Sequence, residues 1–219
     1  MNLITIPVGD LGVNTYLYFD SDKREGVLID PGADAAKIVT TVQRAGKGEP
    51  LRITAILLTH GHFDHIGAVR DIQAHPEIDA PVYAARAEAE LLNDPKLNVS
   101  WTLGENEIVF DPSEYLPLED GATIPVGSHT LRVISTPGHT VGSICLYDED
   151  MDALFSGDTL FQQSVGRANF PTGHEATLLD SIRTKLYALP AETRVYPGHG
   201  GNTSIGYEMQ HNPYARPLV

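Results

Sequence analysis

The chain has 219 residues, of which 42% are hydrophobic, and its mean hydropathy is −0.14. These values are typical of a globular protein with a substantial core, and we interpret residues 1–219 as a single domain. The net charge of −14 disfavours nucleic acid and anionic membrane surfaces as partners, and no apolar run approaches the roughly 20 residues of a membrane-spanning helix.

The first part of the chain alternates short apolar runs with glycine-containing turns, which predicts strands. We expect strands at residues 2–8, 13–20 and 26–30, a helix at 33–47 and a buried strand at 53–58. The N-terminal run lacks the basic region and the small-residue cleavage site of an export signal, so we interpret it as a strand. The single cysteine allows no internal disulfide, which indicates a reducing, cytoplasmic compartment.

The rest of the chain repeats this organisation. We expect a helix at 66–74, a strand at 80–84, a helix ending near 93, an aperiodic surface segment at 94–120, strands at 123–126, 129–136, 143–147, 152–157 and 193–196, and helices at 175–189 and 202–211. Cys145, inside one of these strands, is expected to be a buried thiol. Because both halves combine several strands with later helices, the predicted fold class is α+β, an αββα sandwich of two mixed sheets between helices.

The segment Thr59–Gly67 follows the buried strand at 53–58 and contains three histidines and an aspartate within six residues. Such a density of polar groups is too costly for a core and favours metal binding. His60 and His62 are two apart in an extended turn, so both side chains can share one ion. Asp64 and His65 follow as the chain enters a helix, so they are expected to face a neighbouring position. The segment therefore predicts two half-sites.

Three further candidate ligands stand at strand ends. His139 and His199 each close a Pro-Gly-His tripeptide, in which Pro presets φ and Gly allows a sharp turn. Asp158 follows the strand that contains residues 153–155, and it is the strand-end carboxylate that can join two cations. Asp30 has two interpretations of equal weight, as the acceptor of a Pro-Gly turn or as a carboxylate that orients a ligand histidine. The other histidines are not expected to be ligands: His75, His129, His174 and His211.

This pattern resembles the metallo-β-lactamase superfamily, in the arrangement of the glyoxalase II-type hydrolases. The resemblance covers nearly the whole chain and implies a metallo-β-lactamase-type αββα sandwich with the metals at one edge of the sheets. It implies that one metal is held by His60, His62 and His139, and the other by Asp64, His65 and His199, with Asp158 bridging. Asp64 and Asp158 are therefore the carboxylates of the implied catalytic centre. The residues Gly157–Phe161 and Gly166–Arg167 are similar to those of compact bacterial glyoxalase II-like proteins.

The implied activity is metal-dependent hydrolysis of a small-molecule thioester such as S-lactoylglutathione. All candidate ligands are nitrogen or oxygen donors, which suits two divalent ions, Zn²⁺ foremost, with Fe or Mn as alternatives. A bridging hydroxide would attack the thioester carbonyl, so no Ser or Cys nucleophile is required. Arg167 has two interpretations: it captures an anionic substrate near the metals, or it pairs with a nearby Asp or with backbone carbonyls.

Two rival functions and two departures from the family remain. Persulfide dioxygenases resemble this scaffold and use one iron, for which His60, His139 and Asp158 could serve; a metal-binding protein without turnover is the third possibility. Full-length glyoxalase II carries a C-terminal helical domain that grips glutathione, and we expect only one helix after His199. Compact relatives often have an acidic residue where Asn169 stands. The sequence therefore leaves open the thiol carrier, as well as the native metal and the oligomeric state, and the expected lack of export disfavours a classical β-lactamase.

Overall fold

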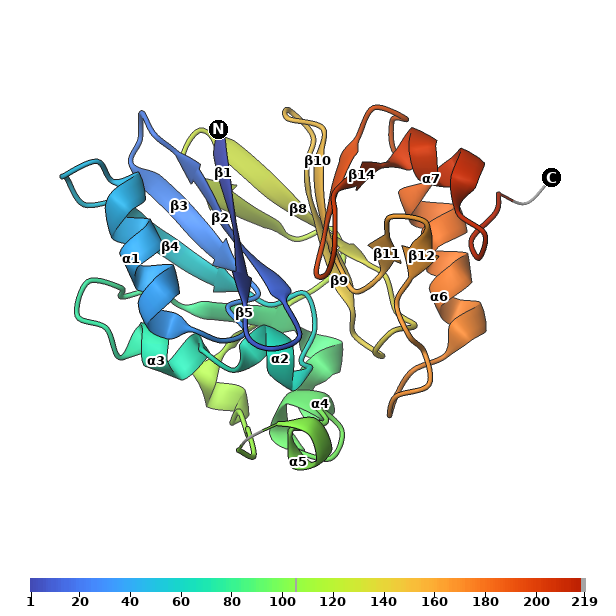
Figure 1. The fold of residues 1–219 in the computed structure, drawn as a ribbon, viewed down its shortest axis with the longest axis horizontal. Coiled ribbons are helices and arrows are strands. Elements are labelled where there is room, and N and C mark those ends of the chain that lie inside the picture. The colour runs from blue at the N-terminus through green and yellow to red at the C-terminus, as the bar shows by residue number, and fades with distance from the viewer. Residues whose placement is uncertain (105, 218–219) are drawn as a thin grey trace.

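The computed structural model describes residues 1–104 and 106–217 and consists of two six-stranded sheets that face each other between two layers of helices (Figure 1). The first sheet pairs its strands in chain order: β1 (Asn2–Val8), β2 (Val13–Asp20), β3 (Glu25–Ile29), β4 (Arg52–Leu57), β5 (Val82–Ala85) and β6 (Leu116–Leu118). Its first two pairings are antiparallel, and the other three are parallel. The predicted αββα sandwich is confirmed.

The second sheet has the strand order β14-β13-β10-β9-β8-β7. Its strands are β7 (Thr123–Val126), β8 (His129–Ser135), β9 (Ile144–Asp148), β10 (Ala153–Gly157), β13 (Arg194–Pro197) and β14 (Thr203–Ser204). All pairings are antiparallel except β10 with β13, so these two strands end at the same edge. A small separate hairpin is formed by β11 (Leu160–Phe161) and β12 (Ser164–Val165).

Three hydrophobic clusters correspond to the three contacts between layers. Helices α1 (Ala35–Ala45) and α3 (Val69–Gln73) cover the first sheet, whereas α6 (Glu175–Ser181), its π-helical continuation Ile182–Leu186 and α7 (Ile205–His211) cover the second (Figure 1). Strand alternation divides the first sheet between two of these clusters: Leu28 packs toward α1, and its neighbours Val27 and Ile29 pack toward the second sheet.

Several predicted boundaries were wrong, each for a local reason. The segment 94–120 includes a short helix, α5 (Ser100–Leu103), and the edge strand β6. Pro117 argued against a strand in the sequence, but an edge strand tolerates a residue without a backbone N–H. The helix expected at 66–74 is two short helices, α2 (Phe63–Ile66) and α3. The last helix starts at Ile205 because residues 203–204 pair with β13 instead. Between β5 and α5, a 3₁₀ turn at Arg86–Glu88 leads into α4 (Ala89–Asn93). A second 3₁₀ turn, at Pro112–Glu114, precedes β6.

The candidate ligands gather where strands of both sheets end. His60 follows β4, His139 follows β8, Asp158 follows β10 and His199 follows β13. An isolated bridge between Val13 and His199 joins the two sheets at this edge. Within the described residues, no helix has both the length and the apolar character needed to cross a membrane.

Candidate metal centre

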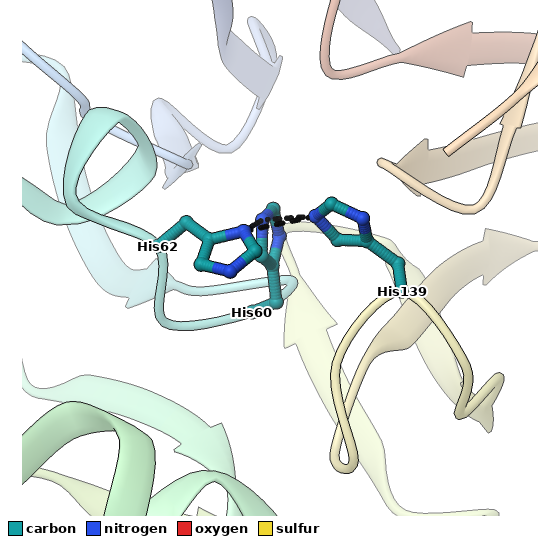
Figure 2. Close-up of side chains that lie close together, drawn as sticks. All are labelled: His60, His62 and His139. Carbon is teal, nitrogen blue, oxygen red and sulfur yellow. Dashed lines mark hydrogen bonds between the residues drawn. The ribbon is translucent and has the colours of Figure 1, made fainter. Parts of the chain in front are cut away.

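The imidazoles of His60, His62 and His139, here called the three-histidine group, converge on one point (Figure 2). The His62 Nδ1 atom lies 3.1 Å from His60 Nε2 and 2.9 Å from His139 Nε2, and the two Nε2 atoms are 3.2 Å apart. All three residues are buried, with 1–3% of their surface exposed. Burial lowers the pKa of each imidazole, in the case of His62 to about 3, so the group is held neutral.

In His60 and His139, the hydrogen bond made by Nδ1 determines whether Nε2 carries a proton or a lone pair. The Nδ1–H of His139 donates to the Arg167 carbonyl at 2.6 Å. The Nδ1–H of His60 donates to the Thr59 hydroxyl at 3.1 Å, because that hydroxyl itself donates to Asp30. Both Nε2 atoms therefore carry lone pairs, which face each other at 3.2 Å. Two facing lone pairs in a buried site favour a bound cation between them.

The second set of ligands, Asp64, His65 and His199, is here called the mixed group. The Asp64 carboxylate lies 3.4 Å from His199 Nε2 and 3.9 Å from His65 Nε2. Burial disfavours a charge on either imidazole, but the surrounding carboxylates outweigh burial, so the pKa values of His65 and His199 are raised. In the same way, burial raises the pKa of Asp64, but the two histidines outweigh it and the net shift is downward.

Each histidine of the mixed group also has an outward partner. The Nδ1–H of His65 donates to Asp30 Oδ2 at 2.9 Å, and the Nδ1–H of His199 donates to the Leu11 carbonyl at 3.2 Å. Asp30 is 2% exposed and also accepts the backbone N–H and the hydroxyl of Thr59. The structure thus places Asp30 where it orients a histidine, which decides between its two interpretations.

Asp158 lies between the two groups. Its Oδ1 is 3.4 Å from His65 Nε2, and its Oδ2 is 3.7 Å from His139 Nε2 and 3.6 Å from His199 Nε2. Burial disfavours its charge, but the neighbouring imidazoles dominate, so its pKa is lowered and the side chain is a carboxylate. It is therefore the group that can contact a cation on either side.

Three buried atoms of this cluster have no hydrogen-bond partner within the described residues: His62 Nε2, His65 Nε2 and Asp158 Oδ1. Buried polar atoms are almost always paired, and two of these three point between the ligand groups. A metal ion would supply a partner for His65 Nε2 and Asp158 Oδ1, so the donor set fits divalent cations. All seven candidate ligands from the sequence are brought together, and their assignment to individual ions is a prediction.

Tight backbone packing at two glycines holds the ligands at these positions. A Cβ at Gly198 would stand 2.3 Å from Asp158 Oδ1 and 2.7 Å from His65 Cε1, so only glycine fits in the second Pro-Gly-His. A Cβ at Gly166 would stand 1.7 Å from the Asp158 carbonyl oxygen, so only glycine lets the segment before Arg167 pack against the centre.

Glu88 was missed by the sequence analysis. It is fully buried and accepts the backbone N–H groups of Gly61 at 2.8 Å and Gly142 at 2.6 Å. It thereby joins the loop of His60 and His62, from the first sheet, to the loop that follows His139, from the second. Burial raises its pKa. No spacing in the sequence indicated this role, because its partners are two glycines far along the chain.

Arg167 lies at the surface beside the three-histidine group. Its guanidinium carbon is 4.6 Å from the centre of the Phe170 ring, and its Nε donates to Asn169 at 3.2 Å. The Phe170 ring packs 5.2 Å from the His62 ring, so the Arg167–Phe170 pair borders the centre. Its interpretation as a residue that pairs with an Asp has no support within the described residues.

The remaining polar candidates lie outside the cluster. His75, His174 and His211 make local hydrogen bonds to Glu77, Thr177 and Tyr207, respectively, and His129 bonds to Asp148 on the neighbouring strand. Cys145 is fully buried, and burial raises the pKa of its thiol to about 11, so it is protonated at neutral pH. This agrees with its interpretation as a core residue.

Comparison with known proteins identifies the class. A family model described as the metallo-beta-lactamase superfamily matches residues 8–199. The probable metallo-hydrolase YqgX of Bacillus subtilis (strain 168) is 38% identical over 209 residues, 95% of each chain. The hydroxyacylglutathione hydrolase GloC of Haemophilus influenzae is 31% identical over 215 residues, 98% of each chain. The chain belongs to the metallo-β-lactamase superfamily.

Solved structures with this fold carry several different descriptions. The BLEG-1 B3 metallo-beta-lactamase has a TM-score of 0.87 with 41% identity, covering 98% of this chain and 99% of the other. A di-iron-bound form of TTHA1623 has a TM-score of 0.81 with 35% identity, covering 96% and 99%. ETHE1 from Myxococcus xanthus has a TM-score of 0.78 with 29% identity, covering 98% and 85%. Since these descriptions differ, the glyoxalase II-like assignment stays a prediction.

Proposed function

We propose that the protein is a thioester hydrolase that uses two divalent metal ions. The observation that carries the proposal is the position of Asp158, with one carboxylate oxygen near His65 and the other near both His139 and His199. A dinuclear centre lowers the pKa of bound water toward ~7 and polarises a carbonyl at neutral pH.

The residues of this chain would hold and orient that centre. The three-histidine group supplies neutral nitrogens, and the mixed group supplies two further imidazoles and the Asp64 carboxylate. Hydrogen bonds to Asp30, Arg167 and Leu11 fix the ring orientations from behind. Arg167, exposed beside Phe170, is positioned to attract an anionic end of a substrate. Cys145 takes no part, since its thiol is buried and protonated.

The name of one relative supports the thioester. GloC of Haemophilus influenzae is described as a hydroxyacylglutathione hydrolase, and it matches this chain over almost its full length. We infer a related reaction, with S-lactoylglutathione as the first substrate to examine and Zn²⁺ as the first metal. The similarity to a di-iron-bound structure makes iron the alternative metal.

A mononuclear iron persulfide dioxygenase is the second candidate, with His60, His139 and Asp158 as the iron ligands. The similarity to ETHE1 favours it. The complete mixed group favours the hydrolase, because a single iron leaves the Asp64 and His199 side chains without a ligand role.

The test combines metal analysis with two assays on the same preparation. We expect about two metal ions per chain and hydrolysis of S-lactoylglutathione, with no oxygen uptake on glutathione persulfide. One iron per chain with oxygen uptake would establish the dioxygenase instead. Metal binding without either activity would support a non-catalytic metal-binding protein.

A further inference from the structure

A pocket of about 570 Å³ opens beside the mixed group. Its wall includes Asp64, the loop between β1 and β2, the start of α1 and the end of α5. The β1–β2 loop also touches the centre, because its Leu11 carbonyl accepts the Nδ1–H of His199. The pocket therefore adjoins the mixed group, and it is here called the acidic pocket for the residues described below.

The mouth of the acidic pocket is apolar. Leu11 and Leu103 line it and are 56% and 59% exposed, although large aliphatic side chains are usually buried. Phe63 and Ile108 continue the apolar wall inward. Exposed apolar side chains that gather at a pocket favour a ligand with an apolar part.

The charge of the acidic pocket has one sign. Asp10, Asp34 and Asp71 line it, as does Asp64, whose charge a bound metal would offset, and its lining within residues 1–104 and 106–217 contains no Lys, Arg or His. Asp34 accepts the Gly9 N–H at 3.0 Å. Asp10 and Asp71 take part in no ion pair in the described part of the chain.

The nearby basic side chains are directed elsewhere. Arg70 precedes Asp71 on α3, but its guanidinium donates to Glu114 at 2.8–3.0 Å. Lys37 lies in the first turn of α1, and its amine donates to the Pro7 carbonyl at 2.5 Å. Arg167 borders the three-histidine group on Phe170, and it does not line this pocket. The two sides of the centre therefore differ in charge.

We propose that the acidic pocket binds an apolar group that carries a positive charge. This inference rests on the proposed thioesterase activity, under which the charged apolar group is the part of the thioester substrate that extends past Asp64 into the pocket. The Leu11, Phe63 and Leu103 side chains contact its apolar portion, and Asp10 and Asp71 attract its charge. An anionic carrier such as glutathione would be repelled by the same carboxylates and would lie instead on the side of Arg167, which does not line this pocket.

Binding is tested without turnover by calorimetric titration of the metal-loaded protein. The probes are choline and its uncharged isostere 3,3-dimethylbutan-1-ol. We expect choline to bind about fivefold more tightly than the uncharged isostere, because one favourable charge contact exposed to water lowers the Kd by about this factor. The Asp10→Asn/Asp71→Asn variant should lose most of this preference, since Asp34 is the remaining carboxylate of the lining besides Asp64. Asp34 and Asp64 stay unchanged, because one holds Gly9 and the other is a candidate ligand.

The matched control removes two exposed carboxylates at the strand ends that lie away from the metal centre. Asp22 lies in the β2–β3 turn and Asp150 in the β9–β10 turn, so Asp22→Asn/Asp150→Asn changes the net charge equally. It should retain the preference for choline. Equal binding of both probes by the unmodified protein, or an equal loss of preference in the control, would overturn the proposal.

Hydrolysis then separates this inference from the proposed function. The substrates are butanoylthiocholine, the uncharged S-(3,3-dimethylbutyl) thiobutanoate and the anionic S-butanoyl-3-mercaptopropionate. We expect kcat/KM to fall in that order, with the differences in KM. If no thioester is cleaved but choline is preferred, the proposed function fails and the acidic pocket stands. If the anionic thioester is cleaved best, the acidic pocket proposal fails and the hydrolase stands.

Discussion

The three-histidine group and the mixed group lie on either side of Asp158, yet their imidazoles have opposite pKa shifts. In the first group, burial dominates and lowers the pKa values of His60, His62 and His139. In the second, Asp158 and Asp64 outweigh burial and raise the pKa values of His65 and His199. The three-histidine group thus offers neutral nitrogen donors that carry no charge of their own. In the mixed group, the positive charge on the imidazoles partly balances the negative charge of Asp64 and Asp158.

This difference indicates how firmly each group should hold a metal. A proton must leave an imidazole before a metal binds, so a raised pKa makes protons competitors. The mixed group compensates through its carboxylates, which attract a divalent ion more strongly than neutral nitrogen does. The predictions below test this contrast, from the largest expected effect to the smallest.

Asp158→Ala should have the largest effect, because it removes the carboxylate shared by both groups. We expect loss of at least one metal ion and a fall in kcat of more than about 100-fold, beyond the range seen when outer partners of metal ligands are changed. Elemental analysis and steady-state kinetics measure both. His75→Ala is the control, since the His75 ring accepts the Glu77 N–H and belongs to neither ligand group. Equal activity in the two variants would mean that the centre is wrongly assigned.

Acidification should empty the mixed group first. The raised pKa values of His65 and His199 lie above 6.5, so protons compete there at a higher pH than at the three-histidine group, where they are lowered. Below its imidazole pKa, each unit of pH should weaken a site about tenfold per proton displaced. Co²⁺ spectra along a pH series, with His199→Ala as the reference for an emptied mixed group, identify the order. Simultaneous loss, or earlier loss from the three-histidine group, would contradict the contrast.

Asp30→Asn should weaken the mixed group more than the three-histidine group, because Asp30 contacts His65 directly and His60 only through the Thr59 hydroxyl. The carboxylate receives the Nδ1–H of His65 at 2.9 Å, so the amide disturbs its orientation and basicity. We expect metal affinity there to fall about 10–100-fold, measured by competition with a chelator. Asp20→Asn is a matched control, because Asp20 is also buried and accepts backbone N–H groups, but it lies at the far end of β2. A similar loss of affinity in the control would indicate a general effect on folding.

Glu88→Gln should weaken the three-histidine group instead. The amide would place an N–H₂ against the N–H of Gly61 or Gly142, which loosens the contact between the two ligand loops. We expect about tenfold weaker binding at this group, the cost of a charged hydrogen bond. Glu208→Gln is the control, because Glu208 is equally buried and accepts the Gln163 N–H near α7. Both variants should lower the unfolding temperature, and only Glu88→Gln should change metal affinity.

The sequence predicted the candidate ligands better than it predicted what holds them. His60, His139 and His199 each stand in a motif that encodes both a turn and a candidate ligand, so short-range information was sufficient to place them at strand ends. Glu88 acts through backbone groups 27 and 54 residues away, which no local pattern reveals. The edge strand β6 was missed for a similar reason, since pairing with β5 defines it more than its composition does.

Arg167→Ala should have the smallest effect and tests the side opposite the acidic pocket. The guanidinium is exposed, so its contact with an anionic substrate should contribute less than the about 1.5–3 kcal/mol of a buried charged hydrogen bond. We expect KM for an anionic thioester to rise about two- to fivefold, with kcat, metal content and KM for an uncharged thioester unchanged. Arg132→Ala is the control, because Arg132 also stacks on an aromatic ring, that of Tyr147, along β8. An equal loss with both thioesters, or a clearly lower unfolding temperature, would assign Arg167 to the scaffold.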